Sequence, residues 1–139
     1  MNSGKNSAAL WQRIPADINQ RLHLCLDQVV TELSQRDGIV GFFRADDVAV
    51  PGRKLAKLID IFSKHQVPLT LAVVPAWLTE SRWQRLVELC SKDRSLWCWI
   101  QHGWRHRNHE PQGRRLEFGP SRSFSRKRKD LQTGFQRLS

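Results

Sequence analysis

Three short apolar runs, separated by stretches with helical periodicity, constrain the fold of this chain more than any other feature. The runs are 39–43, 69–74 and 95–100, and their nearly continuous apolar character is typical of strands covered on both faces. Apolar residues spaced three and four apart in 55–62 and 83–90 predict one helix in each gap. The order strand, helix, strand, helix, strand therefore predicts an α/β fold in which parallel βαβ units form one sheet.

Turn formers and capping residues suggest where further helices begin and end. Pro15, followed by apolar positions through Leu33, predicts an N-terminal helix that ends at Asp37-Gly38. Thr79 or Ser81 is suited to cap the helix that precedes the third strand.

The segment after the third strand has a different composition. Turn formers and charges predominate from His106 to Pro120, which predicts a loop of about fifteen residues, a length more typical of functional or disordered segments than of structural ones. Sparse apolar positions beyond Ser121 permit a last helix. Because those positions are few, we expect residues 121–139 to pack loosely or to extend from the body of the protein.

The chain has 139 residues, which is enough for one domain with a real core. No apolar run approaches the length of a membrane span and no secretory signal precedes the first helix, so we expect a cytoplasmic protein without membrane contact. Three cysteines without C-x-x-C spacing argue against a disulfide framework and a cysteine zinc site. Most of the net charge of +10 lies in residues 101–139, which carry ten Lys and Arg against three Asp and Glu.

The residues with the most obvious chemistry follow the ends of the predicted strands. Asp46 and Asp47 come after the first run, and His102 and His106 come after the third. Because ligands bind at the carboxyl ends of parallel strands, these side chains should converge on one edge. Adjacent carboxylates repel each other unless a cation or a proton intervenes, and histidine with carboxylate is the ligand set of catalytic zinc sites. We expect Asp47, His102 and His106 to bind a divalent metal, with zinc the expected ion and Asp46 as the general base.

Other side chains near these positions have candidate roles. Arg44 could anchor Asp46 or contact substrate, with an ordinary surface salt bridge as the alternative, and Trp104 could form a wall of a substrate pocket. His109 is a second-choice metal ligand. His23 and His65 lie on predicted helices away from the strand ends and are interpreted as structural.

Two of these segments resemble motifs of the polysaccharide deacetylases with NodB-like homology. Segment 43–47, Phe-Arg-Ala-Asp-Asp, is similar to the first motif of that family, and segment 101–106, Gln-His-Gly-Trp-Arg-His, is similar to its second. Segments 67–75, 108–111 and 117–119 resemble an uncharacterised bacterial branch of the same family. The resemblance covers roughly residues 38 to 135.

The resemblance implies a distorted (β/α) barrel and metal-dependent removal of N- or O-acetyl groups from a carbohydrate or a related acetylated substrate. Asp46 would be the base and Asp47, His102 and His106 the metal ligands, with water attacking the acetyl carbonyl and the metal stabilising the oxyanion. Val48 replaces the Gly that often follows the acid pair. The later motifs, including the general-acid histidine, have no counterpart here.

The sequence therefore predicts an extension at 1–14 and a partial deacetylase-like domain at 15–139, with a basic segment at 121–139. A chain without the later motifs should be a poor catalyst, and its bare sheet edges should favour self-association. The alternative is a small basic protein that binds nucleic acid or another polyanion without catalysis. We favour the hydrolase and expect no nucleic-acid partner, because the run at 126–129 has no interleaved aromatic residues.

Overall fold

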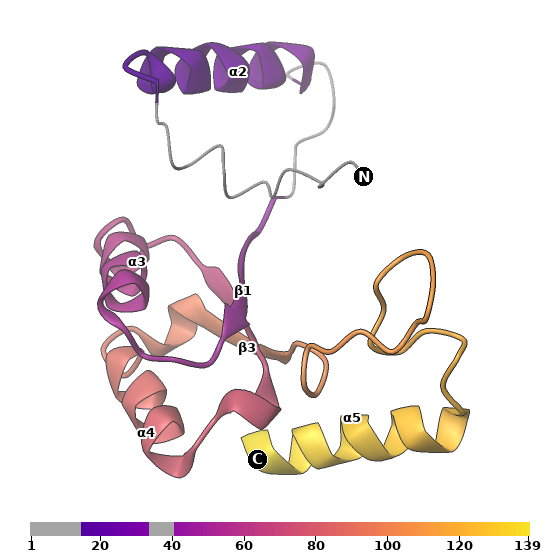
Figure 1. Ribbon diagram of the computed structural model, residues 1–139. Coiled ribbons are helices and arrows are strands. Elements are labelled where there is room, and N and C mark those ends of the chain that lie inside the picture. Colours follow the sequence, from indigo (N-terminus) through magenta and orange to yellow (C-terminus); the bar gives the residue numbers. More distant parts are fainter. Residues whose placement is uncertain (1–14, 34–40) are drawn as a thin grey trace. The chain divides into compact units, whose positions relative to one another are not determined.

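Three parallel strands alternate with helices in the computed structural model, which describes residues 15–33 and 41–139 (Figure 1). The strands β1 (Phe43–Val48), β2 (Leu69–Val73) and β3 (Trp97–Gln101) lie side by side in that order. Their connections contain α3 (Arg53–Lys64), η1 (Pro75–Trp77), α4 (Glu80–Leu89) and η2 (Arg94–Leu96). The predicted parallel βαβ units are confirmed, and the sheet formed by the described residues is not closed into a barrel.

Helix α2 (Ile18–Leu33) belongs to a separate compact unit that spans residues 1–41. Its first turn follows Pro15, whose carbonyl oxygen accepts a hydrogen bond from the Ile18 amide at 3.1 Å. The predicted end of this helix at Asp37-Gly38 lies outside the described residues. Within 15–33 and 41–139, no helix has the length and apolar character that a membrane crossing requires.

The first strand is shifted along the sequence from its predicted position. It was expected at 39–43, whereas β1 runs from Phe43 to Val48 and so contains the acidic pair; residues 39 and 40 lie outside the described part. The expectation of burial on both faces is wrong for this strand, because positions 43–47 are exposed or half-exposed and only Val48 is buried. As an edge strand, β1 pairs only with β2 in the described sheet.

One face of the sheet carries the hydrophobic core. Leu69, Leu71 and Val73 on β2 pack there with Ile59 of α3 and Leu86 of α4. Figure 1 shows α3 and α4 on the same side of the sheet. Because successive side chains in a strand point to opposite faces, the remaining positions of each strand lie on the other face.

That second face is more polar and less covered. Arg44, Thr70 and Cys98 occupy matching positions on the three strands, with Arg44 paired to Thr70 and Thr70 to Cys98 in register. Arg44 and Cys98 are exposed and Thr70 is half-buried. The predicted limits of β2 and β3 were close to the observed ones. The exposure of Arg44 and Cys98 shows that this second face of the sheet is not fully covered.

The ends of α3 and α4 are set by the residues next to them. Helix α3 ends at Lys64, with His65 as its C-cap residue. The Thr79 hydroxyl oxygen accepts a hydrogen bond from the Arg82 amide at 3.3 Å, so Thr79, of the two candidates, caps α4.

Helix α5 (Phe124–Leu138) corrects the expectation that residues 121–139 pack loosely. Its C-terminal half packs on the body: Leu138 contacts the hydrophobic core, and the Arg137 guanidinium donates to the Leu78 carbonyl oxygen at 2.7 Å. A Cβ atom at Gly134 would lie 2.1 Å from Nε2 of Gln101, so this glycine permits close contact between α5 and the end of β3. Four successive basic residues, 126–129, are spread around the helix instead of forming one basic face.

Candidate metal centre

An irregularity in β1 determines where the acidic pair points. Ala45 is paired with Leu71 and Val48 with Val73, so Asp46 and Asp47 together lie opposite one residue of β2. This is a β-bulge, and Asp47 occupies it with a left-handed backbone at φ 59°. The extra residue returns Val48 to the core face and redirects the side chain of Asp47 toward the carboxyl edge of the sheet.

The two histidines are presented by a turn that begins where β3 ends. The His102 amide continues the sheet pairing by donating to the Val73 carbonyl oxygen at 2.7 Å. Gly103 and His106 then adopt positive φ angles of 68° and 54°, which fold the segment back on itself. The imidazole rings of His102 and His106 consequently stack, with centroids 5.1 Å apart and planes inclined by 27°.

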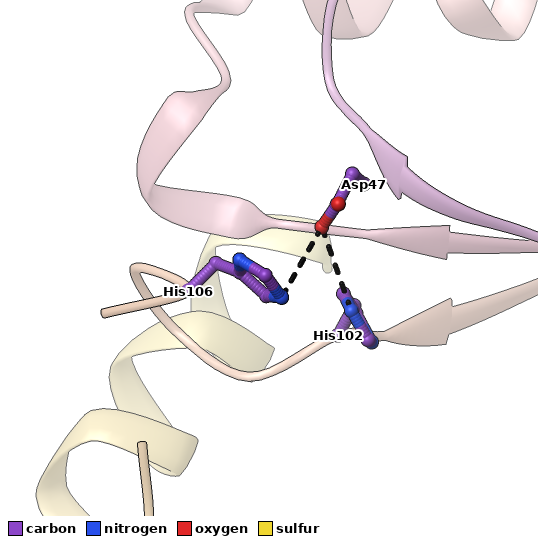
Figure 2. Close-up of side chains that lie close together, drawn as sticks. All are labelled: Asp47, His102 and His106. Carbon is purple, nitrogen blue, oxygen red and sulfur yellow. Dashed lines mark ion pairs between the residues drawn. The ribbon is translucent and has the colours of Figure 1, made fainter. Parts of the chain in front are cut away.

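Asp47, His102 and His106 converge as the sequence predicted (Figure 2). Oδ1 of Asp47 lies 3.5 Å from Nε2 of His102 and 3.5 Å from Nε2 of His106. One possible ligand atom from each residue lies within 4.8 Å of the other two. These three residues could therefore hold a metal ion.

The two distances from the Asp47 carboxylate to the histidines fit such an ion. Ligand atoms around a tetrahedral ion with bonds of about 2.1 Å are separated by roughly 3.4 Å. The two distances of 3.5 Å match this separation, and they exceed the 2.7 to 3.2 Å of a direct N–H···O hydrogen bond. One carboxylate and two imidazoles leave room for further ligands, as in catalytic zinc sites.

The triad lies at the surface, beside an exposed tryptophan. The side chain of His102 is 25% exposed and those of His106 and Asp47 are each 49% exposed, so small molecules can reach the donors. Trp77 of η1 packs edge-on against His106, with ring centroids 5.9 Å apart. Because 39% of Trp77 remains exposed, it offers an aromatic surface next to the metal ligands.

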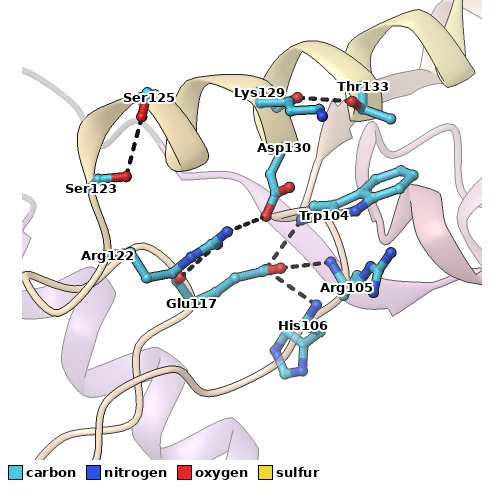
Figure 3. A network of polar contacts seen from close by, with 10 residues as sticks. All are labelled: Trp104, Arg105, His106, Glu117, Arg122, Ser123, Ser125, Lys129, Asp130 and Thr133. Carbon is cyan, nitrogen blue, oxygen red and sulfur yellow. Dashed lines mark hydrogen bonds and ion pairs between the residues drawn. The ribbon is translucent and has the colours of Figure 1, made fainter.

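Glu117 fixes the conformation of the turn that carries His106 (Figure 3). Its carboxylate accepts hydrogen bonds from the amides of Trp104 at 3.1 Å, Arg105 at 2.6 Å and His106 at 3.2 Å. A Cβ atom at Gly103 would lie 2.1 Å from Oε2 of Glu117, so the close approach requires glycine. Glu117 thus stabilises the backbone from Trp104 to His106, the part of the turn that leads to the second histidine.

A second link holds the Glu117 segment against α5. The Arg122 guanidinium donates to the Glu117 carbonyl oxygen at 3.4 Å and forms an ion pair with Asp130 at 2.8 Å. Both side chains of this ion pair are largely buried, and their contact is visible in Figure 3. The turn is therefore connected through Glu117 and Arg122 to the C-terminal helix.

Asp46, the predicted base, is not a member of the converging group. It forms a two-pronged ion pair with Arg44, at 2.7 Å from Nε to Oδ1 and 2.9 Å from Nη2 to Oδ2. The hydrogen bond and the charge of Asp46 raise the pKa of the Arg44 guanidinium. The predicted contact between Arg44 and Asp46 is thus present, while Asp46 is next to Asp47 in the chain but points elsewhere.

The other predicted residues are placed as follows. Trp104 is 8% exposed, and Arg105 lies over its ring at 5.9 Å. Trp104 therefore packs beneath the turn and presents little surface to a substrate.

His109 is half-buried and does not join the triad, and its amide donates to the Leu116 carbonyl oxygen. His65 is the C-cap residue of α3 and His23 lies on α2, and both side chains are exposed.

Trp77 and Glu117 are the residues near the triad that sequence reasoning missed. In the sequence Glu117 belongs to a segment that resembles the family, and its eleven-residue separation from His106 gives no local signal of contact. Comparisons of the chain with protein-family models, with curated proteins and with solved structures found no match.

Proposed function

We propose that the chain is a metal-dependent hydrolase of the polysaccharide-deacetylase type, which removes an acetyl group from a carbohydrate or a related acetylated substrate. The observation that supports it is the convergence of Asp47, His102 and His106 from two strand ends, with Nε2–Oδ1 distances of 3.5 Å. The same residues occupy the ligand positions in the two motifs that resemble this family. Zinc is the proposed ion, because one carboxylate and two imidazoles suit it.

A bound metal would polarise the acetyl carbonyl and make a water molecule a stronger nucleophile. Asp47, His102 and His106 would hold it at the carboxyl edge of the sheet, and Glu117 would keep the histidines in position. Asp46 is the proposed base. Its guanidinium partner Arg44 is largely exposed, so the ion pair can open when substrate or metal binds.

The fold is proposed to be the first part of a distorted (β/α) barrel. Three parallel strands in sequential order, with both connecting helices on one side, are the arrangement from which such barrels are built. The more polar face that carries Arg44 and Asp46 would then face the interior. The free edge of β3 is proposed to pair with further strands or with another copy of the chain.

An acetate-release assay tests the proposed reaction. The chain is incubated with acetylated chito-oligosaccharides with and without zinc, alongside Asp46→Asn and, as a control on α3, Asp60→Asn. We expect slow release that requires zinc, is lost in Asp46→Asn and is unchanged in Asp60→Asn. Zinc binding with no release above the Asp46→Asn background would contradict deacetylation by this chain.

A further inference from the structure

An open cavity of about 440 Å³ lies along the loop that follows His106 and has no role in the proposal above. It is lined by His106, Arg107, Asn108, Arg115, Leu116 and Glu117. Its volume lies within the ~300 to 1,000 Å³ typical of small-molecule sites. Because His106 is both a wall of the cavity and a member of the metal triad, a molecule in the cavity would lie beside the metal centre.

Hydrogen bonds join the first part of this loop, near Asn108, to its last part, near Leu116. The His109 amide donates to the Leu116 carbonyl oxygen at 3.1 Å. Oδ1 of Asn108 accepts hydrogen bonds from the amides of Glu110 and Leu116, each at 3.0 Å. These hydrogen bonds bring Arg107 and Arg115, which are eight positions apart in sequence, to the same cavity.

The lining of the cavity carries a net positive charge, because its two arginines outnumber its one glutamate. In the part of the chain that the structure describes, the side chains of Arg107 and Arg115 form no hydrogen bond or ion pair. The carboxylate of Glu117, the acidic residue of the lining, already accepts three backbone N–H groups. Two guanidinium groups therefore remain available for an external anion.

We propose that this cavity binds an anionic group of the substrate, a carboxylate or a phosphate carried on the acetylated sugar. Guanidinium groups bind both anions through paired N–H donors, and the half-exposed Leu116 supplies an apolar contact for the sugar. Occupation of the cavity would place the acetyl group of a one- or two-residue sugar near the triad. The inference rests on the proposed function in taking the anion to be part of the substrate.

Calorimetric titration of the metal-free chain tests this site without relying on catalysis. The probes are N-acetylglucosamine 6-phosphate, N-acetylglucosamine, which lacks the anion, and glucuronic acid, which supplies a carboxylate instead. The variants are Arg107→Gln, Arg115→Gln and, as a matched control, Arg114→Gln, because Arg114 lies on the same loop but does not line the cavity.

We expect the sugar phosphate or the uronic acid to bind at least about threefold more tightly than the neutral sugar. Loss of one exposed guanidinium partner should weaken that binding roughly threefold to tenfold in Arg107→Gln and Arg115→Gln. Arg114→Gln should bind as the unaltered chain does. The stronger of the two anionic probes identifies whether phosphate or carboxylate is the preferred group.

Equal binding of charged and neutral sugars would overturn the proposal. An equal loss of binding affinity in all three variants would also overturn it. So would tighter binding of a short single-stranded oligonucleotide, if Arg114→Gln weakens that binding as much as Arg107→Gln and Arg115→Gln do. In both cases the general positive charge of the loop would be responsible. Binding that depends on Arg107 and Arg115 in a chain that takes up no zinc would support the anion site while refuting the proposed metal-dependent reaction.

Discussion

Nε2 of His106 lies 3.5 Å from Oδ1 of Asp47, and both residues adopt a left-handed backbone conformation, with φ of 54° and 59°. Residues other than glycine in this conformation cost on the order of 1 kcal/mol or more each. Sheet pairing around the bulge fixes Asp47, and the carboxylate of Glu117 fixes the amide of His106. Strain at two of the three proposed ligands, sustained by surrounding contacts, is typical of a functional site.

Gly103→Ala should destabilise the chain and weaken metal binding. The new methyl group would combine a positive φ of 68° with a contact of 2.1 Å to Oε2 of Glu117. We expect the free energy of unfolding to fall by about 2 kcal/mol, measured by urea denaturation. Gly113→Ala is the matched control, because Gly113 has φ of 80° but no atom within 4 Å of its Cβ position. Equal losses in the two variants would show that the contact with Glu117 has no effect.

Glu117→Gln should weaken zinc binding by roughly 10- to 100-fold, the usual effect of removing a partner that orients metal ligands. The amide NH2 group of glutamine would replace one carboxylate oxygen and would face a backbone N–H that now donates to that oxygen. Two donors cannot form a hydrogen bond with each other, so the turn between the histidines would shift. Glu110→Gln is the control, since Glu110 accepts hydrogen bonds from the amide and hydroxyl of Ser121 in the same loop. A smaller effect of Glu117→Gln than of Glu110→Gln on the zinc dissociation constant would contradict this role.

Cys90 should resist modification while Cys98 and Cys25 react. Burial raises the pKa of the Cys90 thiol from 9.0 to about 11, so at pH 8 roughly one in a thousand of these thiols is ionised. The other two cysteines are exposed. Mass spectrometry after brief iodoacetamide treatment of the folded chain should find label at positions 25 and 98 only. Rapid labelling of Cys90 would show that this thiol is not buried in the core.

The same thiol makes stability depend on pH at the alkaline end. Its folded pKa is above its ordinary value, so the folded chain holds the proton more tightly than the unfolded chain. This contribution is fully present below pH 9 and is lost as the pH rises toward about 11. Cys90→Ala should therefore reduce the alkaline loss of stability, measured as the change in urea midpoint between pH 8.5 and 10.5. An unchanged slope would exclude Cys90 as its cause.

Much of the fold could be predicted because hydrophobic periodicity reports local structure directly. Leu69 to Val73 and the helix containing Ile59 follow the strand and helix patterns closely. The limits of β1 could not be predicted, since Arg44 is held by pairing with Thr70 of β2 and not by its own propensity, and Asp46 and Asp47 lie in a bulge. The position of α5 depends on tertiary contacts such as that between Gly134 and Gln101, which leave no periodic signal.

The candidate site was partly predictable for a geometric reason. The carboxyl ends of parallel strands in one sheet lie at the same edge, so the positions of Asp47, His102 and His106 in the sequence indicated that they would lie close together. The bulge at Asp46 and Asp47 could not be foreseen, nor could the ion pair of Asp46 with Arg44 that keeps Asp46 out of the group. Glu117 was missed because its partners are backbone amides, which carry no residue-specific signature.

Calorimetric titration of the metal-free chain with zinc tests the metal centre most directly, using His102→Gln, His106→Gln and the neighbouring control His109→Gln. We predict one zinc ion per unaltered chain, a loss of affinity of more than about 100-fold in each triad variant, and unchanged binding in His109→Gln. Absence of zinc binding by the unaltered chain, or equal binding by all four proteins, would contradict a metal centre formed by Asp47, His102 and His106.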